Sequence, residues 1–310
     1  MASAILHIKD AYYFDVPKFM WRHDYTSLDQ VPAFLRDRHP HATPEEFNEA
    51  LDGKILIPQP FGTLKNLYEK ESGFAISKFM VLELLVALIM AVLFIRLATK
   101  MRTTLVPRGR MWHFLEGILF YIRDEIAMPA IGHHDADRFV PLLWTMFFFI
   151  LLCNVMGLVP WAGSPTASFG VTLALAAVTL TTVLVAGMMK FGFVGFWLNQ
   201  IPHMELPLVL AIFLKPMIFV IEVVGLVIRH GVLAVRLLAN MMAGHVVLLA
   251  VMALAFSVAG AASEKWWLTA FISVIGSTLL CCLELFVAVL QAYVFTFLSA
   301  LFIGSAVHRH

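Results

Sequence analysis

The sequence predicts an all-α membrane protein with about five transmembrane helices, the last two long and strongly tilted as a hairpin, plus an interfacial amphipathic helix. Hydrophobic residues make up 60% of the chain and charged residues 14%, against roughly 25% charged residues in soluble domains. The mean hydropathy is +0.83, and the apolar residues gather in runs long enough to cross a bilayer. We expect an extramembrane segment at residues 1–76 and a membrane domain at residues 77–310.

Charge and cysteine content argue against several classes of protein. The net charge of +1 supplies no dominant basic patch, so we expect no nucleic-acid partner. The three cysteines are Cys153 and the adjacent pair Cys281 and Cys282, without a C-x-x-C spacing. Neither a disulfide framework nor a metal site is therefore predicted. The adjacent His133 and His134 lack further ligands, and we expect no cofactor.

Residues 1–76 are polar and rich in aromatic residues, with several prolines that interrupt regular structure. Short helices are expected at residues 28–37 and 44–51, the second with Thr43 as its N-cap. The N-terminus lacks the basic-then-apolar pattern of a signal peptide. Acids and histidines are scattered here without a catalytic arrangement, so we interpret this segment as a docking or interface region.

The first predicted span covers residues 77–97, with Glu83 as its only acid. About twenty apolar residues are enough to cross the bilayer core. A basic cluster follows directly and indicates that this end of the span is cytoplasmic. The N-terminus is therefore expected outside. The cluster consists of Lys100, Arg102, Arg108 and Arg110.

Residues 108–128 alternate apolar and charged positions at helical spacing. This pattern predicts an amphipathic helix that lies in the membrane interface. A polar loop is expected to follow at residues 129–137. The apolar positions of the helix are Trp112, Leu115, Leu119, Ile122 and Ile126.

Two further spans are predicted at residues 139–159, which include Asn154, and at residues 169–189. The loop between them, residues 162–168, has no lysine or arginine, as expected of an outer loop. Lys190 marks the return to the cytoplasmic side.

The apolar run at residues 205–259 is too long for one perpendicular crossing. As a single helix it would reach roughly 80 Å, against about 30 Å for the hydrocarbon core. It forms either two perpendicular spans broken near residues 229–231 or one strongly tilted helix. We favour the tilted helix, because one crossing leaves the weakly basic C-terminus in the cytoplasm. The final run, residues 266–307, then completes a tilted hairpin.

A polar stripe follows one face of the helix predicted at residues 205–259. Positions seven apart are nearly eclipsed on a helix, and Glu222, Arg229 and Arg236 fall in this register. Asn240 lies one turn beyond on the same face, whereas His245, nine residues past Arg236, turns to the opposite face. Such a stripe must face water, protein or a partner charge instead of lipid.

Structural roles account for some of these polar groups. Glu222 and Arg229 are spaced to form an ion pair, and Asn154 suits a hydrogen bond between helices. Arg236 differs, because no acid lies three or four residues from it in its own helix. Its partner is therefore expected from another element or another chain.

The last run carries Glu284 and Gln291, seven residues apart and hence on one face. Gln291 can serve as a hydrogen-bonding contact between helices. An acid and a histidine at depth in neighbouring helices suit a proton relay, which makes Glu284 and His245 candidates. His245 can equally be a satisfied core histidine.

Three ordered stretches resemble subunit a of F-type ATP synthases. R-L-L-A-N-M-M-A-G-H at residues 236–245 resembles the signature R-L-x-x-N-x-x-x-G-H of that family. F-F-F-I-L-L-C-N-V-M-G-L-V-P at residues 147–160, with a Pro-Thr pair after it, resembles the N-L-x-G-L-x-P span. E-L-F-V-A-V-L-Q-A-Y-V-F at residues 284–295 resembles the final-helix motif. The resemblance covers roughly residues 107–305.

The resemblance implies a proton-translocating stator subunit with two aqueous half-channels separated by Arg236. It implies that Arg236 faces the essential carboxylate of a rotating c-ring, with Gln291 and Asn240 close to it. His245 and Glu284 match positions where some members carry the acid and the histidine in reverse order.

Glu222 and Asn154 match further polar positions of the family. The implied partners are the c-ring, b-type subunits of the peripheral stalk and the lipid bilayer. The implied location is the bacterial plasma (inner) membrane, with the C-terminus in the cytoplasm. The chain is expected to carry no catalytic site of its own. Whether the ion is H⁺ or Na⁺ is not set by this chain, because that ligand set lies mostly on the c-ring.

Two other functions fit the composition. A stand-alone cation/proton antiporter would show inverted repeats with broken helices, and neither is visible. A haem- or quinone-binding redox subunit would use some of the twelve histidines as paired axial ligands on facing spans. Only His230 and His245 are clear candidates inside the predicted spans.

Overall fold

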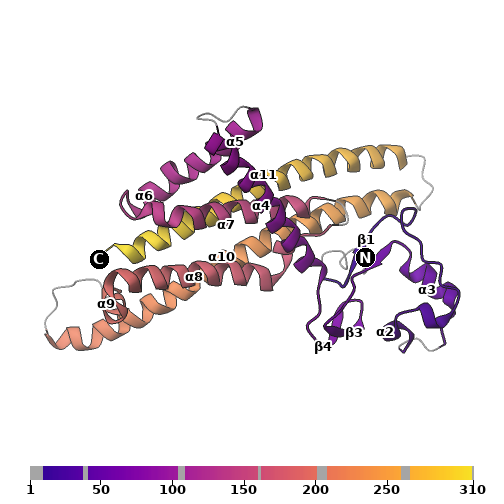
Figure 1. Cartoon of the computed structure of the whole chain (residues 1–310), viewed down its shortest axis with the longest axis horizontal. Helices are drawn as coiled ribbons and strands as arrows, with labels where there is room; N and C mark the ends of the chain where they lie inside the picture. The colour runs from indigo at the N-terminus through magenta and orange to yellow at the C-terminus, as the bar shows by residue number, and fades with distance from the viewer. Residues whose placement is uncertain are drawn as a thin grey trace.

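The computed structural model describes residues 10–37, 41–103, 109–159, 162–200, 208–259 and 266–308. Helices dominate from residue 78 onward, and the two longest run side by side through the molecule (Figure 1). The residues before them form a smaller part with short strands and helices beside one end of the helical bundle (Figure 1). Some residues used in the predictions lie outside the described ranges. They include residues 1–9, 108, 160, 205–207, 260–265 and 309–310.

The smaller part contains two antiparallel strand pairs. β1 (Tyr13–Asp15) pairs with β2 (Lys54–Leu56), and β3 (Gly62–Asn66) pairs with β4 (Glu69–Gly73). No strand was predicted here, and the longest of the four has five residues. A strand this short has too few alternating positions to stand out in the sequence.

The helix predicted at residues 44–51 is confirmed as α3 (Pro44–Leu51). Thr43 and Glu46 form a reciprocal capping box, in which each side chain binds the backbone N–H of the other residue. This arrangement satisfies two backbone donors that a helix N-terminus otherwise leaves open.

The single helix predicted at residues 28–37 is wrong. Two short pieces replace it, the 3-10 helix η1 (Leu28–Gln30) and α2 (Ala33–Arg36). Pro32 separates them and disfavours helical geometry at the residue before it. Val31 is accordingly extended, with φ −77° and ψ 134°.

The first predicted span is confirmed as α4 (Lys78–Thr103), which is long and apolar enough to cross a membrane. One stripe of α4 is buried against α7, while much of the remaining surface is exposed and apolar. The buried stripe consists of Phe79, Leu82, Val86, Met90 and Leu97.

A helical segment follows, as predicted, from α5 (Arg110–Tyr121) through the π-helical turn η2 (Ile122–Ala127) to α6 (Met128–Ile131). Its predicted orientation in the membrane interface stays a prediction. The polar loop predicted at residues 129–137 is wrong at both ends. Pro129 lies in the first turn of α6, where proline is tolerated, and α7 (Ala136–Gly157) begins before residue 137.

The second and third spans are confirmed as α7 and α8 (Phe169–Phe191). The 3-10 helix η3 (Pro165–Ala167) lies in the loop between them, and α9 (Phe193–Asn199) follows α8. The α7–α8 loop lies at the end of the bundle where α4 begins, because Gly163 contacts Lys78 and Phe79.

The two over-long runs form continuous helices, α10 (Leu208–Ala259) and α11 (Trp266–Val307). A break near residues 229–231, the alternative for the first run, is therefore wrong. The two helices have 52 and 42 residues, or roughly 78 and 63 Å at 1.5 Å per residue. Helices of this length cross a bilayer core of about 30 Å only when strongly tilted or when they extend beyond it.

The two helices pack as an antiparallel hairpin (Figure 1). Residues later in α10 contact residues earlier in α11, and these contacts define the register of the pair. The contacting pairs are His230 with Phe302, Asn240 with Gln291, His245 with Glu284, and Val251 with Ser273.

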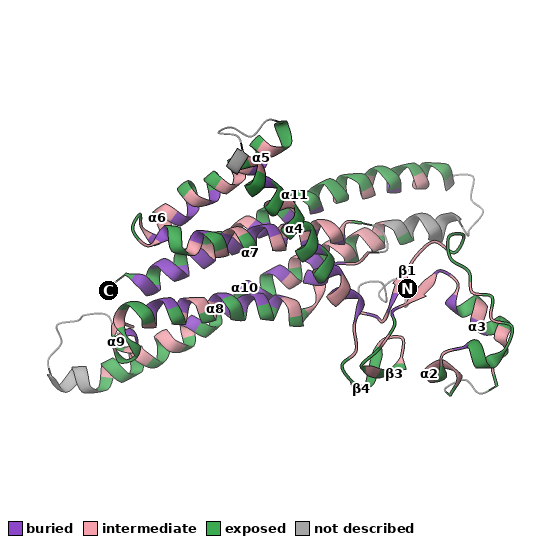
Figure 2. Cartoon of the chain, in the orientation of Figure 1, coloured by how far each residue is buried: buried purple, intermediate pink, exposed green. Residues whose placement is uncertain are grey.

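The core of the helical bundle lies where α7 and α8 cover one side of this hairpin. Most of its side chains are apolar, and buried polar residues such as Asn154 and Gln291 lie among them. The outward sides of α10 and α11 are exposed over much of their length (Figure 2). Large apolar side chains cover these outward sides, as in a protein surrounded by lipid or by membrane partners. Five described helices are long and apolar enough to span a membrane, in agreement with the predicted fold class.

Candidate functional site

His245 on α10 and Glu284 on α11 face each other across the hairpin. His245 Nδ1 lies 2.7 Å from Glu284 Oε1, and their side chains are only 16% and 7% exposed. The opposite ring nitrogen, Nε2, lies 3.0 Å from the carbonyl oxygen of Gly157 on α7.

The Gly157 carbonyl determines where protons can reside on this pair. A carbonyl oxygen only accepts hydrogen bonds, so Nε2 carries a proton and donates it. One further proton can then lie between His245 Nδ1 and Glu284 Oε1, on either atom. The pair can therefore hold one further proton, either as an imidazolium beside a carboxylate or as two neutral groups.

Two glycines allow the helices to approach at this pair. A Cβ on Gly244 would lie 2.9 Å from Glu284 Oε1, closer than real Cβ contacts permit. A Cβ on Gly157 would lie 2.6 Å from Ser164 Cβ in the α7–α8 loop. Both glycines thus leave room for polar groups to pack around His245.

A cluster of buried polar side chains adjoins Gly157. Thr166 Oγ1 donates to Asn154 Oδ1 at 2.7 Å, and the hydroxyls of Thr166 and Ser164 are 2.8 Å apart. Asn154 Nδ2 donates to the carbonyl oxygen of Ala288 on α11 at 3.4 Å. All three side chains are buried. The sequence identified Asn154, whereas Ser164 carried no signal.

Asn240 and Gln291 connect the same two helices further along the hairpin. Asn240 Nδ2 donates to Gln291 Oε1 at 3.2 Å. Gln291 is buried, and its Nε2 finds no hydrogen-bond acceptor within the described ranges. This donor is free to bind a group supplied by water or by another chain.

Arg236 lies on the outward side of α10 and is exposed. It lines a shallow groove of about 440 Å³ whose other lining residues are all apolar or glycine. No acid or amide of the described residues forms an ion pair or hydrogen bond with it. The groove is lined by Ile228, Gly231, Val232, Val235, Arg236 and Ala239.

Glu222 and Arg229 form an ion pair within α10, and both are partly exposed. The structure thus brings the predicted polar residues together in three separate groups. His245, Glu284 and Asn154 gather around Gly157, whereas Asn240 and Gln291 bond to each other. The structure does not bring Glu222 and Arg236 together. Arg229 binds Glu222, and Arg236 points outward.

His230 is a further buried polar residue, which the sequence identified only as a candidate axial ligand for the redox-subunit alternative. Its Nδ1 lies 2.8 Å from the carbonyl oxygen of Leu226, and its ring packs on Phe302 at 4.9 Å between centroids. Its Nε2 is buried and has no hydrogen-bond partner among the residues described.

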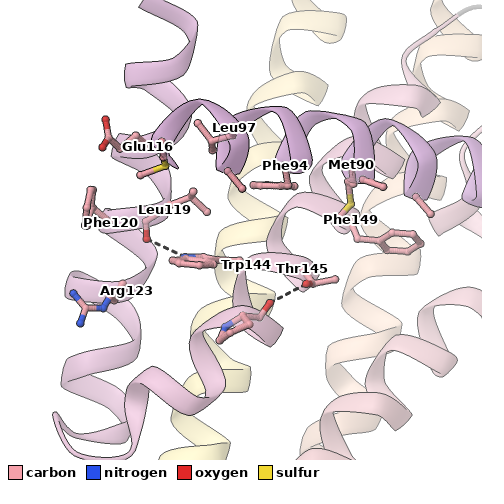
Figure 3. Close-up of a pocket in the computed structure, with 15 residues that line it drawn as sticks. Met90, Phe94, Leu97, Glu116, Leu119, Phe120, Arg123, Trp144, Thr145 and Phe149 are labelled. Carbon is pink, nitrogen blue, oxygen red and sulfur yellow. Dashed lines mark hydrogen bonds between the residues drawn. The ribbon is translucent and has the colours of Figure 1, made fainter. Parts of the chain in front are cut away.

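A larger cavity, of about 810 Å³, lies between α4, α5 and α7 (Figure 3). In it Trp144 Nε1 donates to the Leu119 carbonyl oxygen at 3.0 Å. Among the described residues that line it, only Glu116 and Arg123 are charged, and Arg123 is held by Asp137. A cavity this apolar suits an acyl chain or a hydrophobic side chain, so we do not assign ion transport to it.

Ion pairs lie at the surface of the bundle at the end opposite the α7–α8 loop. Lys190 at the end of α8 binds Asp135, and this hydrogen bond lowers the pKa of the Asp135 carboxyl from its ordinary value. Arg123 binds Asp137 through two nitrogens, at 2.8 and 3.2 Å. Within the described ranges, no three residues of the metal-binding types form a cluster.

Comparison with known proteins identifies the family. The ATP synthase A chain family matches residues 80–304. An ATP synthase subunit a from Myxococcus xanthus is 41% identical over 226 residues, which are 72% of this chain and 70% of that protein. An ATP synthase subunit a 2 from Prosthecochloris aestuarii is 33% identical over 281 residues, 89% of this chain and 83% of that protein.

Another relative, an ATP synthase subunit a from Anaeromyxobacter dehalogenans, is 41% identical over 216 residues. These residues are 69% of this chain, and they span about half of that relative, 53%. The family match covers the three sequence stretches that resemble subunit a, and all five membrane-length helices lie within it or overlap it. The chain therefore belongs to the ATP synthase subunit a family.

Proposed function

We propose that this chain is the proton-translocating stator subunit of an F-type ATP synthase, in which Arg236 separates two aqueous half-channels. The contrast between the two sides of α10 supports this proposal. Arg236 is exposed on an apolar surface without a partner in the described chain. His245 is turned inward to a proton-holding pair with Glu284.

The arginine acts through a charge that it keeps. A guanidinium is a very strong base and keeps its positive charge even in an apolar setting. Against a c-ring, it lowers the pKa of each passing rotor carboxylate, which then releases its proton. It also repels protons that would otherwise pass directly from one half-channel to the other.

The buried pair serves the outer half-channel in this proposal. A proton arriving from outside resides between His245 Nδ1 and Glu284 Oε1 before transfer to a rotor carboxylate. Asn154 orients the neighbouring hydroxyls, and Asn240 with Gln291 lies between this pair and Arg236 along the hairpin. Glu222, on the side of Arg236 away from this pair, serves the inner half-channel. The membrane potential supplies about 2.3 kcal/mol per charge per 100 mV to drive each transfer.

The same proposal assigns the partner subunits of the chain and its orientation in the membrane. The exposed apolar side of α10 around Arg236 faces the c-ring, and b-type stalk subunits bind elsewhere on the membrane domain. Residues 1–76 lie outside the membrane, and the C-terminus lies in the cytoplasm of a bacterium with the chain in its inner membrane. ATP chemistry takes place on other subunits, so this chain needs no cofactor.

The test is Arg236→Ala in the assembled ATP synthase, reconstituted in vesicles. We expect loss of both ATP synthesis and ATP-driven proton pumping. Lys215→Ala is the matched control, because it removes another exposed cation from α10 and should leave both activities in place. Normal rates of synthesis and pumping in Arg236→Ala would overturn the proposal.

A further inference from the structure

We propose that Glu83 is a further proton-carrying residue, which links the outer surface at the start of α4 to the buried hydroxyl cluster at Asn154. The inference deepens the proposed function and rests on it. It adds an outer portion to the half-channel, built where the residues before α4 meet the α7–α8 loop.

Glu83 is an acid placed on the packed side of a membrane-length helix. It lies in the second turn of α4, at helical spacing from the buried residues Phe79, Val86 and Met90. Its Oε1 atom is buried and has no hydrogen-bond partner among the described residues. A buried carboxyl oxygen without a hydrogen-bond partner costs free energy in a membrane protein. A structural role facing lipid does not explain why an acid occupies this position.

On its outer side Glu83 adjoins a group of charges from the N-terminal segment. Lys78 begins α4, is only 2% exposed, and lies with its Nζ 3.9 Å from Asp15 Oδ2. Asp10 accepts a hydrogen bond from the backbone N–H of Phe79, one turn before Glu83, at 3.3 Å. Burial raises the pKa of Asp10, so this carboxyl takes up a proton more readily than an exposed one.

On its inner side, α4 packs against α7 and against the α7–α8 loop. Phe79, one turn before Glu83, lies 3.3 Å from the position of a Cβ on Gly163, the residue before Ser164. The same start of α4 touches the α7–α8 loop, because a Cβ on Gly163 would lie 3.4 Å from Lys78 Nζ. The hydroxyls of Ser164 and Thr166 follow directly in that loop.

In this proposal, these half-buried and buried polar groups follow one another from the surface to the proton-holding pair. Asp10 and Lys78 lie at the outer end, and Glu83 comes next. The linked hydroxyls of Ser164 and Thr166 lie beside Asn154, and Ser164 lies against Gly157, whose carbonyl oxygen accepts a hydrogen bond from His245. A hydroxyl donates and accepts at once, so it can relay a proton between an acid and a base.

The proposed step is a simple proton transfer. The Glu83 carboxylate binds a proton from the outer side and becomes a neutral carboxylic acid. It then releases that proton inward, along the hydroxyls and water, to the His245–Glu284 pair. The Glu83 carboxylate is restored, so only O–H and N–H bonds are made or broken and no charge accumulates on Glu83.

The first test compares Glu83→Gln with Glu83→Asp in the assembled complex. Glutamine keeps the shape but cannot carry the proton, so passive proton flux through vesicles stripped of the soluble ATPase part should fall several-fold. Aspartate should restore most of the flux. Glu116→Gln, the same exchange on α5, is the matched control and should leave the flux unchanged.

A chemical rescue separates proton transfer from a structural role. In a variant lacking Cys153, Cys281 and Cys282, Glu83→Cys is treated from outside with a thiosulfonate reagent that attaches either a carboxylate or a neutral group of similar size. Only the carboxylate should restore proton flux. Equal flux with both attached groups, or unchanged flux in Glu83→Gln, would overturn the inference.

The outcome is distinguishable from failure of the proposed function. Arg236→Ala measured in parallel reports on the half-channels themselves. If Arg236→Ala abolishes coupling while Glu83→Gln is normal, the proposed function stands and Glu83 is only a tolerated acid. If Arg236→Ala keeps coupling, the proposed function fails.

Discussion

The two sides of the α10–α11 hairpin differ in how their polar groups are satisfied. On the inward side, His245 lies within hydrogen-bonding distance of both Glu284 and the Gly157 carbonyl oxygen, and both side chains are largely buried. On the outward side, Arg236 is exposed and lies among apolar residues. The His245–Glu284 pair draws both of its groups from this chain, whereas Arg236 needs a second molecule to pair with its charge. We call the His245–Glu284 pair the finished site. We call Arg236, whose partner must come from another molecule, the half site.

The largest expected effect tests the half site. Arg236→Lys keeps a positive charge but replaces a guanidinium that stays protonated with an ammonium that can lose its proton when buried. We expect coupled ATP synthesis in vesicles to fall by at least about tenfold, corresponding to 1.4 kcal/mol or more in the barrier. Lys215→Arg, the reverse exchange elsewhere on α10, should have no such effect. Full coupling in Arg236→Lys would mean that any cation suffices at this position.

The next effect tests the finished site. His245→Glu and Glu284→His each leave two like groups facing each other, and each should strongly reduce proton pumping. The double exchange restores one acid and one imidazole at a 2.7 Å contact, and we expect it to recover a large part of the activity. A double variant as inactive as either single one would show that the order of the two residues matters, not only their pairing.

A smaller effect comes from the close approach beside this pair. Gly244→Ala places a Cβ 2.9 Å from Glu284 Oε1, so the carboxylate must move away from His245. We expect a partial loss of pumping with normal assembly. Gly276→Ala is the matched control on the same hairpin, because its Cβ would lie 3.6 Å from the nearest atom, an ordinary contact. Equal activities for the two variants would contradict the role given to Gly244.

The smallest effect is expected away from both sides of the hairpin. Asp135→Asn removes the surface ion pair with Lys190 and should cost about 0.5 kcal/mol of stability, because solvent screens this pair. The ion pair lowers the pKa of Asp135, so its contribution is present above the ordinary carboxyl pKa and is lost as pH falls through the lowered value. Thermal unfolding in detergent at neutral and acidic pH measures the difference, and proton pumping should remain unchanged.

The sequence predicted the helices better than the N-terminal segment, for a physical reason. A membrane helix must bury every backbone polar group within itself and present about twenty apolar residues to lipid. Both requirements produce a long apolar run that is easy to recognise in the sequence. The strands β1 to β4 have at most five residues each, and their pairing depends on residues as distant as Tyr13 and Leu56.

The candidate site likewise has features that the sequence predicted and features that it could not predict. Helical spacing alone separated Arg236 from His245, because a nine-residue step turns a side chain to the opposite face. It also grouped Glu284 with Gln291. Spacing could not show that Glu222 is held by Arg229 instead of standing free, although it indicated that the two could pair.

The sequence by itself determined the five membrane-length helices, the faces of α10 and α11 on which the polar residues lie, and the family. These properties depend on composition and on periodicity within one segment. Only the tertiary structure decided which polar groups meet: the register that brings His245 to Glu284, and the glycine gaps beside it. It also placed the N-terminal segment against the start of α4, near Glu83. Such contacts depend on how separate segments pack in three dimensions, and no pattern within a single helix specifies them.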